Sequence, residues 1–313
     1  KRGGLAMATI VAAGGFASVC GSSLATTATL AKISLPEMRK YGYSDRLAGA
    51  SVAAGGTLGI LIPPSVILVL YGIMTQEHIG KLFLAGLVPG LIGVFLYLGA
   101  VRVSLWITPE KIQAHDKLSL RDRIHSLKGV ILTLLLFTFV LGGIYLNVFT
   151  ATEAAGMGAA GAFVITALRG KLTLHATLRM LFDTAKTTAV MFFILFGAMA
   201  FLNFVNLSGL TTDLRNFVTG MGASPYAVIL AILLVYLVLG CLLESLSMIL
   251  LTVPIFHPLV TSLGFDGIWF GIVVVVATEL SFITPPVGMN IFVLRATAPE
   301  VPLTAIYRGI IPF

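Results

Sequence analysis

Several long segments of the chain contain no Asp, Glu, Lys or Arg. A helix that crosses a bilayer needs about 20 consecutive apolar residues, and each of these segments reaches that length. They cover residues 3–31, 47–76, 82–101, 129–152, 187–212 and 216–243. Solid runs of this length are unlike the short alternating segments of a membrane β-barrel. The sequence therefore predicts an all-α, multi-pass membrane protein.

The composition excludes a water-soluble fold. Charged residues make up 11% of the chain and hydrophobic residues 58%, whereas about 25% of the residues of an ordinary soluble domain are charged. A soluble domain of about 300 residues still exposes roughly a quarter of its unfolded-chain surface, which so apolar a chain cannot cover. The net charge of +7 is spread along the chain, so we expect the lipid bilayer as a partner and no nucleic acid.

Two apolar segments are interrupted near their middle by small or polar residues. Residues 8–35 contain the sequence Gly-Ser-Ser at 21–23, and residues 225–260 are broken near 244–247. Each arm is too short to cross the bilayer alone. A chain that turns back at membrane depth is tolerated where protein or water satisfies its backbone. We predict two re-entrant hairpins.

Two further segments are interrupted by paired prolines. Residues 47–74 contain Pro-Pro at 63–64, and residues 270–294 contain Thr-Pro-Pro-Val-Gly at 284–288. Proline removes a helix donor and disfavours helix in the residue before it. We predict two broken helices, in which glycines let the backbone turn: Gly55, Gly56, Gly59 and Gly288.

A hairpin followed by a broken helix occurs twice, at one fixed offset in the sequence. The offset pairs Ser23 with Ser245 and superimposes the two Pro-Pro pairs without a gap. It also matches Leu24 with Leu246, Pro36 with Pro258, Gly42 with Gly264 and Leu58 with Leu280. Internal repeats with interrupted helices in corresponding places are typical of secondary transporters, whose sites lie at the interruptions.

The remaining segments predict the organisation of the chain. Five full crossings are expected between the two hairpins, at 47–74, 82–101, 129–147, 151–168 and 190–207. Since five is odd, the second repeat is inverted relative to the first. Surface helices are predicted within 102–128 and 169–186. The predicted domains are repeat 1 (1–76), scaffold with a surface arm (77–149), scaffold and arm (150–224), repeat 2 (225–298) and the start of a truncated helix (299–313).

The positive charges predict the orientation. Of the 20 Lys and Arg residues, Lys81 and Arg215 fall on one side of this topology and the other 18 on the opposite side. The positive-inside rule makes the second side cytoplasmic. The first hairpin is then expected to enter from the cytoplasm and the second from outside.

The four interruptions concentrate groups that bind ions and carboxylates. Interrupted helices leave N–H groups that attract carboxylates and carbonyls that attract Na⁺. Each Ser or Thr there could instead bond to a carbonyl of its own helix. We nevertheless expect the clusters to form a site, with oxygen donors from Ser22, Ser23, Thr26, Thr57, Ser65, Ser245, Ser247, Thr284 and Asn290.

Two carboxylates fall at the same interruptions. Glu244 lies at the tip of the second hairpin, and Glu279 lies just before the second Pro-Pro pair. Acidic groups at membrane depth are functional by default. They could bind a cation, carry a proton, fix a hairpin or serve only as buried structural groups. The chain contains no H-E-x-x-H, G-x-S-x-G or P-loop motif, so we expect neither an enzyme nor ATP-driven transport.

The interruptions resemble those of the large membrane subunit of tripartite ATP-independent periplasmic (TRAP) transporters. The likeness covers essentially the whole chain. It is carried by Gly-Ser-Ser-Leu-Ala-Thr (21–26), Pro-Glu-Met (36–38), Tyr-Gly-Tyr (41–43), the Gly-Gly-Thr-Leu-Gly-Ile-Leu-Ile-Pro-Pro-Ser run (55–65), Thr-Glu-Ala-Ala (152–155) and the run from Glu279 to Asn290 with Thr-Pro-Pro-Val-Gly.

This resemblance implies a Na⁺-driven importer of organic acids in the bacterial inner membrane. It implies an elevator fold like that of the ion transporter superfamily, a small four-helix membrane subunit and a periplasmic substrate-binding protein. With the residue pattern, it implies substrate contacts from Ser22, Ser23, Thr26, Ser65, Ser245, Pro286, Val287 and Asn290. The implied Na⁺ ligands are Ser23, Gly56, Thr57, Gly59, Pro63, Ser245, Thr284 and Gly288, with Glu244 and Glu279 as coupling carboxylates.

The large subunit of that family is longer at both ends, so we expect this chain to be a fragment. Three alternatives stay open from the sequence. One is a stand-alone Na⁺-coupled symporter for divalent anions, and another is a channel. The third is an intramembrane enzyme that uses Glu244 or Glu279.

Overall fold

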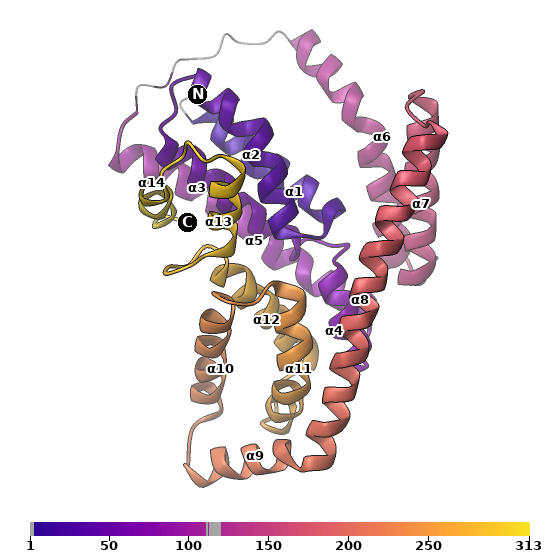
Figure 1. Cartoon of the computed structure of the whole chain (residues 1–313), viewed down its shortest axis with the longest axis vertical. Coiled ribbons are helices and arrows are strands. Elements are labelled where there is room, and N and C mark those ends of the chain that lie inside the picture. Colours follow the sequence, from indigo (N-terminus) through magenta and orange to yellow (C-terminus); the bar gives the residue numbers. More distant parts are fainter. Residues whose placement is uncertain (1–2, 111, 113–119) are drawn as a thin grey trace. The chain divides into compact units, whose positions relative to one another are not determined.

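A computed structural model describes residues 3–110, 112 and 120–313, and these residues contain helices and irregular segments but no strand. Figure 1 shows the helices in chain order. Their bounds are α1 Gly4–Cys20, α2 Ser23–Lys40, α3 Asp45–Gly56, the 3₁₀ turn η1 Thr57–Gly59, α4 Val66–Thr75, α5 Ile79–Ile107, α6 Leu120–Tyr145, α7 Ala151–Leu168, α8 Leu174–Ser208, α9 Leu210–Gly220, α10 Pro225–Leu239, α11 Ser245–Ser262, α12 Gly267–Ser281, α13 Met289–Thr297 and α14 Leu303–Ile310.

Among the described residues, four helices are long and apolar enough to cross a membrane: α5, α7, α8 and α11. Shorter apolar helices include α4, α10, α12 and parts of α1 and α6. An all-α, multi-pass membrane protein is therefore confirmed. Of the positive charges used for the orientation, Lys1, Arg2, Lys111 and Lys117 lie outside the described residues.

The first interrupted segment forms two adjacent helices, α1 and α2. Gly21 has a φ of 65°, a conformation that suits a residue without Cβ. The Ser22 side chain then accepts a hydrogen bond from the backbone N–H of Ala25 and starts α2. The helix α2 continues through Pro36, and Leu35 and Met38 beside this proline are buried.

The first broken helix consists of α3, η1 and α4. The Ser44 side chain caps α3, and the Ser65 side chain caps α4 by accepting from the N–H of Leu68 at 3.3 Å. Between η1 and α4 the chain runs irregularly through the Pro-Pro pair at 63–64. The predicted break therefore lies where expected.

The second set of helices has matching bounds. The offset that takes Ser23 to Ser245 also takes Lys40 to Ser262, so it carries α2 onto α11 from end to end. The same shift takes the first residue of α3 to that of α12, and the last residue of α4 to that of α13. Gly42 and Gly264, which end the turns after α2 and α11, both have positive φ. The repeat seen in the sequence thus extends to the helix bounds.

The chain forms two compact units, which we describe separately. One comprises residues 1–115 and 199–313, and the other comprises residues 116–198. The first unit contains both interrupted segments and both broken helices. The second contains α6, α7 and the first part of α8, with α6 packed on α7. Whether these pieces act as the predicted transport and scaffold domains stays a prediction.

The two predicted surface helices are wrong as separate elements. Residues 120–128 are the start of α6, which continues unbroken into the apolar segment that follows. Residues 174–186 are likewise the start of α8, a single helix of 35 residues. Neither stretch is separated from its apolar continuation by proline. Gly129 follows the first stretch, where glycine could end a helix, but α6 continues through it. Residues 111 and 113–119 of the first predicted helix lie outside the described residues.

Candidate functional site

The tip of the first hairpin meets the second broken helix through a buried hydrogen bond. The Ser23 hydroxyl lies 2.7 and 2.8 Å from the two carboxylate oxygens of Glu279. Both residues are buried, with 1% and 5% of their surface exposed. The two are 256 residues apart in sequence, so only the fold brings them together. A hydrogen bond to a carboxylate is stronger than one between neutral groups.

Gly56, at the end of α3, lies against the same hairpin and the same broken helix. A Cβ at this position would overlap Thr27 Oγ1 and lie 3.1 Å from both Asn290 Nδ2 and the Ser23 carbonyl oxygen. The Asn290 amide in turn donates to the carbonyl oxygen of Ala53 at 3.2 Å. The end of α3, the start of α2 and the start of α13 therefore converge around a glycine that admits no side chain.

Several side-chain oxygens near this convergence have no hydrogen-bond partner among the described residues. They are Thr26 Oγ1, Thr27 Oγ1 and Asn290 Oδ1, and all three side chains are completely buried. Buried polar atoms are nearly always paired, so unpaired oxygens in one place require an explanation. We name Ser23, Thr26, Thr27, Gly56, Glu279 and Asn290 the hairpin-1 cluster.

Thr57 has protein partners of its own. Its hydroxyl donates to the Ala54 carbonyl at 2.7 Å and lies 2.8 Å from the hydroxyl of Tyr97 on α5. Since the Thr57 proton is used by Ala54, Tyr97 is the donor in the second bond. One lone pair of the Thr57 oxygen is left for another ligand.

The tip of the second hairpin is organised by Glu244. Its carboxylate accepts from the backbone N–H of Ser247 at 3.1 Å and lies 3.2 Å from the Ser247 hydroxyl, so it caps α11. Ser245 is the first residue of α11 and is 7% exposed. A Cβ at Gly240 would overlap the Ser281 side chain, so the end of α10 lies directly against the end of α12. This tip therefore approaches the second broken helix as well.

The second break is more open than the first. Pro63 and Ser65 are buried, whereas Pro285 and Pro286 are exposed and Val287 is partly exposed. Thr284 donates to the Leu280 carbonyl at 2.6 Å. This is the bond to its own helix that the sequence left open as the alternative to ligand binding. Gly288 has a φ of 65° and begins α13. The hydroxyl of Tyr307 on α14 reaches the carbonyls of Pro286 and Val287.

The predicted site residues thus divide into groups. Ser23, Gly56, Glu279 and Asn290 come together, and Thr26 lies in the same first turn of α2 as Ser23. Ser22, Ser65 and Glu244 act as helix caps. Gly59 and Pro63 are buried within the first break. Sequence reasoning missed Thr27, Tyr97 and Tyr307. Thr27 lies four residues after Ser23, so helical spacing could have identified it, whereas nothing local indicates the two tyrosines.

One known family matches the whole chain. The family described as "Tripartite ATP-independent periplasmic transporter, DctM component" matches residues 1–313. The chain belongs to this family. It is therefore a subunit of a bacterial TRAP transporter, a membrane permease and not an enzyme. This decides against the intramembrane enzyme, the channel and the stand-alone symporter.

Individual relatives are similar over nearly the same span. The C4-dicarboxylate TRAP transporter large permease protein DctM of Pseudomonas aeruginosa is 38% identical, over 100% of this chain and 73% of its own length. The sialic acid TRAP transporter large permease protein SiaM of Vibrio cholerae is 33% identical, over 99% of this chain and 72% of its own. The 2,3-diketo-L-gulonate TRAP transporter large permease protein YiaN of Escherichia coli is 29% identical, over 100% and 73%.

The permease also ties the base of each hairpin to the loop after the other repeat's broken helix. At the end of α2, Arg39 contacts Asp45 at 2.7 Å and Glu300 at 2.8 Å. In α11, His257 Nε2 lies 3.9 Å from Glu77, which follows α4. Under the offset that relates the repeats, the position directly after Glu77 coincides with Glu300. The helix partners are not equivalent, since the same offset pairs Arg39 with Thr261 and His257 with Leu35, so the two contacts are similar in kind but one helical turn apart.

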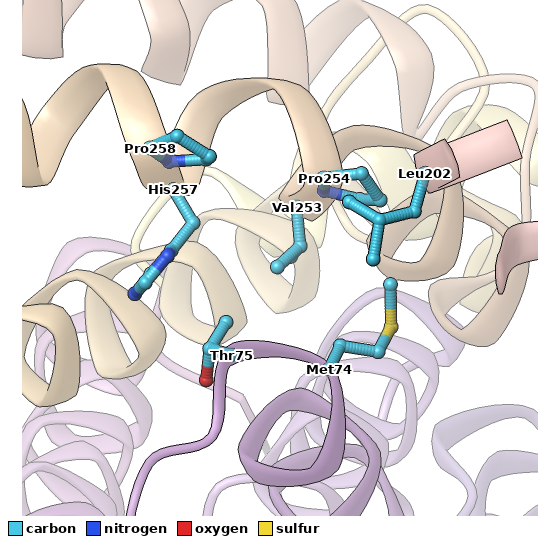
Figure 2. Close-up of a pocket in the computed structure, with 7 residues that line it drawn as sticks. All are labelled: Met74, Thr75, Leu202, Val253, Pro254, His257 and Pro258. Atoms are coloured by element: carbon cyan, nitrogen blue, oxygen red, sulfur yellow. The ribbon is translucent and has the colours of Figure 1, made fainter. Parts of the chain in front are cut away.

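A small pocket lies beside the second of these contacts. Its volume is about 40 Å³, and it is lined by Met74, Thr75, Leu202, Val253, Pro254, His257 and Pro258. Figure 2 shows these side chains around the hollow, most of them apolar. The His257 ring also packs edge-on against Tyr71, with ring centroids 5.9 Å apart. None of the predicted site residues lines this pocket, which agrees with a structural role for His257.

Proposed function

We propose that this permease imports an organic acid across the bacterial inner membrane, driven by a Na⁺ gradient. The observation that supports this most directly is the hairpin-1 cluster. Elements of both repeats meet there around one buried carboxylate and several unpaired oxygens. A hard cation prefers such oxygen donors. In secondary transporters with broken helices, Na⁺ binds at unwound backbone near the repeat interface.

The residues present fit Na⁺. Thr26, Thr27 and Asn290 offer oxygens without other partners, and Glu279 offers compensating negative charge. Bound Na⁺ would supply the positive charge that attracts an anionic solute. Further ligands are proposed from the residues expected at the same interruptions: Ser23, Gly56, Thr57, Gly59, Pro63, Ser245, Thr284 and Gly288. Of these, Thr57 and Thr284 already donate their protons to helix carbonyls.

The solute is proposed to be a carboxylate. The names of the three relatives above refer to C4-dicarboxylates, sialic acid and 2,3-diketo-L-gulonate, all of them organic acids. The second break is more exposed at Pro286 and Val287 and so lies open to such a solute, although Tyr307 already bonds both of their carbonyls and proline has no N–H to donate. Additional contacts are proposed from Ser22, Ser23, Thr26, Ser65, Ser245 and Asn290. Glu244 is assigned to capping α11, and Glu279 is the stronger candidate for coupling.

We propose an elevator movement of the hairpins and broken helices as one body. The compact unit that contains both repeats supports this, because its parts are cross-linked by buried contacts such as Ser23–Glu279. The inverted orientation of the second repeat belongs to the same proposal. The family description names a tripartite system, and we propose a small four-helix membrane subunit and a periplasmic substrate-binding protein as partners.

The experiment measures the thermal stability of the full-length permease in detergent. NaCl is titrated against KCl and choline chloride at constant ionic strength. A ligand that binds only the folded state adds about 2.7 kcal/mol at 100 times its Kd. We expect a stabilisation by Na⁺ alone, which rises with the logarithm of the Na⁺ concentration above the Kd. Na⁺ coupling would be contradicted by two results together. The stability curves would be equal in the three salts, and proteoliposomes with the permease and its two proposed partners would take up succinate without a dependence on Na⁺.

A further inference from the structure

Tyr307 contacts the second break from outside the repeat. Its hydroxyl lies 2.6 Å from the carbonyl oxygen of Val287 and 2.9 Å from that of Pro286. One proton is thus shared between two acceptors. Both carbonyls belong to the irregular stretch between α12 and α13, where no helix bond holds them.

The helix that carries Tyr307 is firmly anchored to α3. On α14, Ile306 and Ile310 are buried. A Cβ at Gly309 would overlap the Arg46 carbonyl, and a Cβ at Gly49 on α3 would lie 3.1 Å from Ile306. The backbones of the two helices therefore approach closely. Tyr307 itself stays partly exposed and extends from this anchored helix to the break.

The contact between Tyr307 and Val287 links two helices that contribute residues to the hairpin-1 cluster, α13 and α3. Val287 immediately precedes Gly288, which begins α13, and Asn290 lies in the first turn of that helix. The α3 contribution to the cluster is Gly56, the last residue of that helix. Because α14 is anchored on α3, a bond from Tyr307 to Val287 sets the start of α13 relative to α3. It thereby sets the Asn290 amide relative to Gly56.

We infer that Tyr307 is a positioning residue for the cation and solute site, holding the second break so that Asn290 stays aligned with Gly56. This inference rests on the proposed function. It also assigns the segment 299–313, expected from the sequence to begin a separate helix, to the machinery of the site. A tyrosine suits the role because its ring reaches across the gap while its hydroxyl still donates.

The test compares Tyr307→Phe with Tyr43→Phe in the full-length permease. Tyr43 is the matched control, because its hydroxyl also bonds a backbone group, the N–H of Leu5 at 3.0 Å, but away from either break. Loss of one hydrogen bond is typically worth about 1 kcal/mol, so we expect about a threefold to tenfold rise in the Kd for Na⁺ that is fitted to the stabilisation, which is the midpoint of Na⁺ binding. Tyr43→Phe leaves this midpoint unchanged.

Hydrogen exchange of residues 284–291 provides the second readout. Tyr307→Phe is expected to speed exchange in this stretch and not in α14 itself. Unchanged exchange, or faster exchange with an unchanged Na⁺ midpoint, overturns the inference. If the unaltered protein does not respond to Na⁺, the proposed coupling fails. The role of Tyr307 is then decided by exchange together with the KM for succinate, which a purely structural tyrosine would leave unchanged.

Discussion

At the residue scale, the pairing of Ser23 with Glu279 is the contact on which the site depends most. A buried carboxylate is costly unless hydrogen bonds stabilise it. Here the Ser23 hydroxyl is the only described side-chain partner of that carboxylate. The bond connects the first repeat to the second at the hairpin tip. Its loss should therefore affect both stability and Na⁺ binding.

We expect Ser23→Ala to lower stability by about 1–3 kcal/mol, because it leaves the Glu279 carboxylate buried without its partner. Glu279→Gln should lower it less, since an amide can still bond to the Ser23 hydroxyl, but should abolish the Na⁺ response. In the double variant the two costs should not add, with a coupling energy of about 1 kcal/mol or more. Unfolding in detergent measures all three variants.

Ser262→Ala is the matched control for the serine. Among the described residues, its hydroxyl bonds only to the Leu259 carbonyl of its own helix, at 2.7 Å. This variant should stay within about 0.5 kcal/mol of the unaltered protein, as substitutions away from special features usually do. Additive costs for Ser23→Ala and Glu279→Gln would show that the two groups act independently.

At the scale of the elements, glycines set how closely the helices approach. Gly56 admits α2 and α13 against the end of α3, and Gly240 admits α12 against α10. Small residues serve the same purpose in membrane helices generally, because close backbone approach increases packing. The charged contacts at the hairpin bases are more exposed. Ion pairs of that kind contribute little to stability, so the glycines matter more.

Gly56→Ala should therefore separate α3 from the first hairpin. The added Cβ would overlap Thr27 Oγ1, and inserting a methyl group into a packed core costs about 1–3 kcal/mol. We expect a lower melting temperature and a weaker response to Na⁺. The same detergent assay with NaCl and choline chloride measures both effects.

Gly99→Ala in α5 is the control for Gly56→Ala. A Cβ there meets nothing within 4 Å. Because alanine favours helix over glycine by roughly 0.5–1 kcal/mol, this variant should be neutral or slightly stabilising. A Gly56→Ala protein as stable and as responsive as Gly99→Ala would refute the packing argument.

At the scale of the whole molecule, we predict that equivalent helices of the two repeats run in opposite directions through the membrane, because an odd number of crossings is expected between the hairpins. Lys40 ends α2 and Ser262 ends α11, so they occupy equivalent positions. The charge distribution places the first on the cytoplasmic side. If the second repeat is inverted, as proposed, Ser262 lies on the periplasmic side.

Cysteine labelling tests this orientation. In a background with Cys20 and Cys241 replaced by alanine, Lys40→Cys should react with an impermeant maleimide only after the cytoplasmic side is exposed. Ser262→Cys should react in intact spheroplasts. Reaction of both from the same side would mean an even number of crossings between the repeats and would rule out inversion. Retained uptake in each variant confirms that the permease is folded.

The sequence by itself determined the elements and their repetition. Gly21, Ser22 and the Pro-Pro pairs act through the backbone nearby, so the interruptions could be located from local chemistry. The fixed offset between the repeats likewise depends on order along the chain alone. The two surface helices were expected to be separate, whereas the structure joins residues 120–128 and 174–186 to the apolar helices that follow them, and no proline marks either junction.

Only the tertiary structure decided which groups meet. The Ser23–Glu279 bond spans 256 residues, and the bonds of Tyr97 and Tyr307 join the breaks to helices beyond the repeats. Such contacts follow from helix packing across the chain, which no local pattern of residues encodes. The same packing distinguishes Thr26, Thr27 and Asn290, whose side-chain oxygens have no partner in the described part of the chain, from Ser22, Ser65 and Glu244, which cap helices.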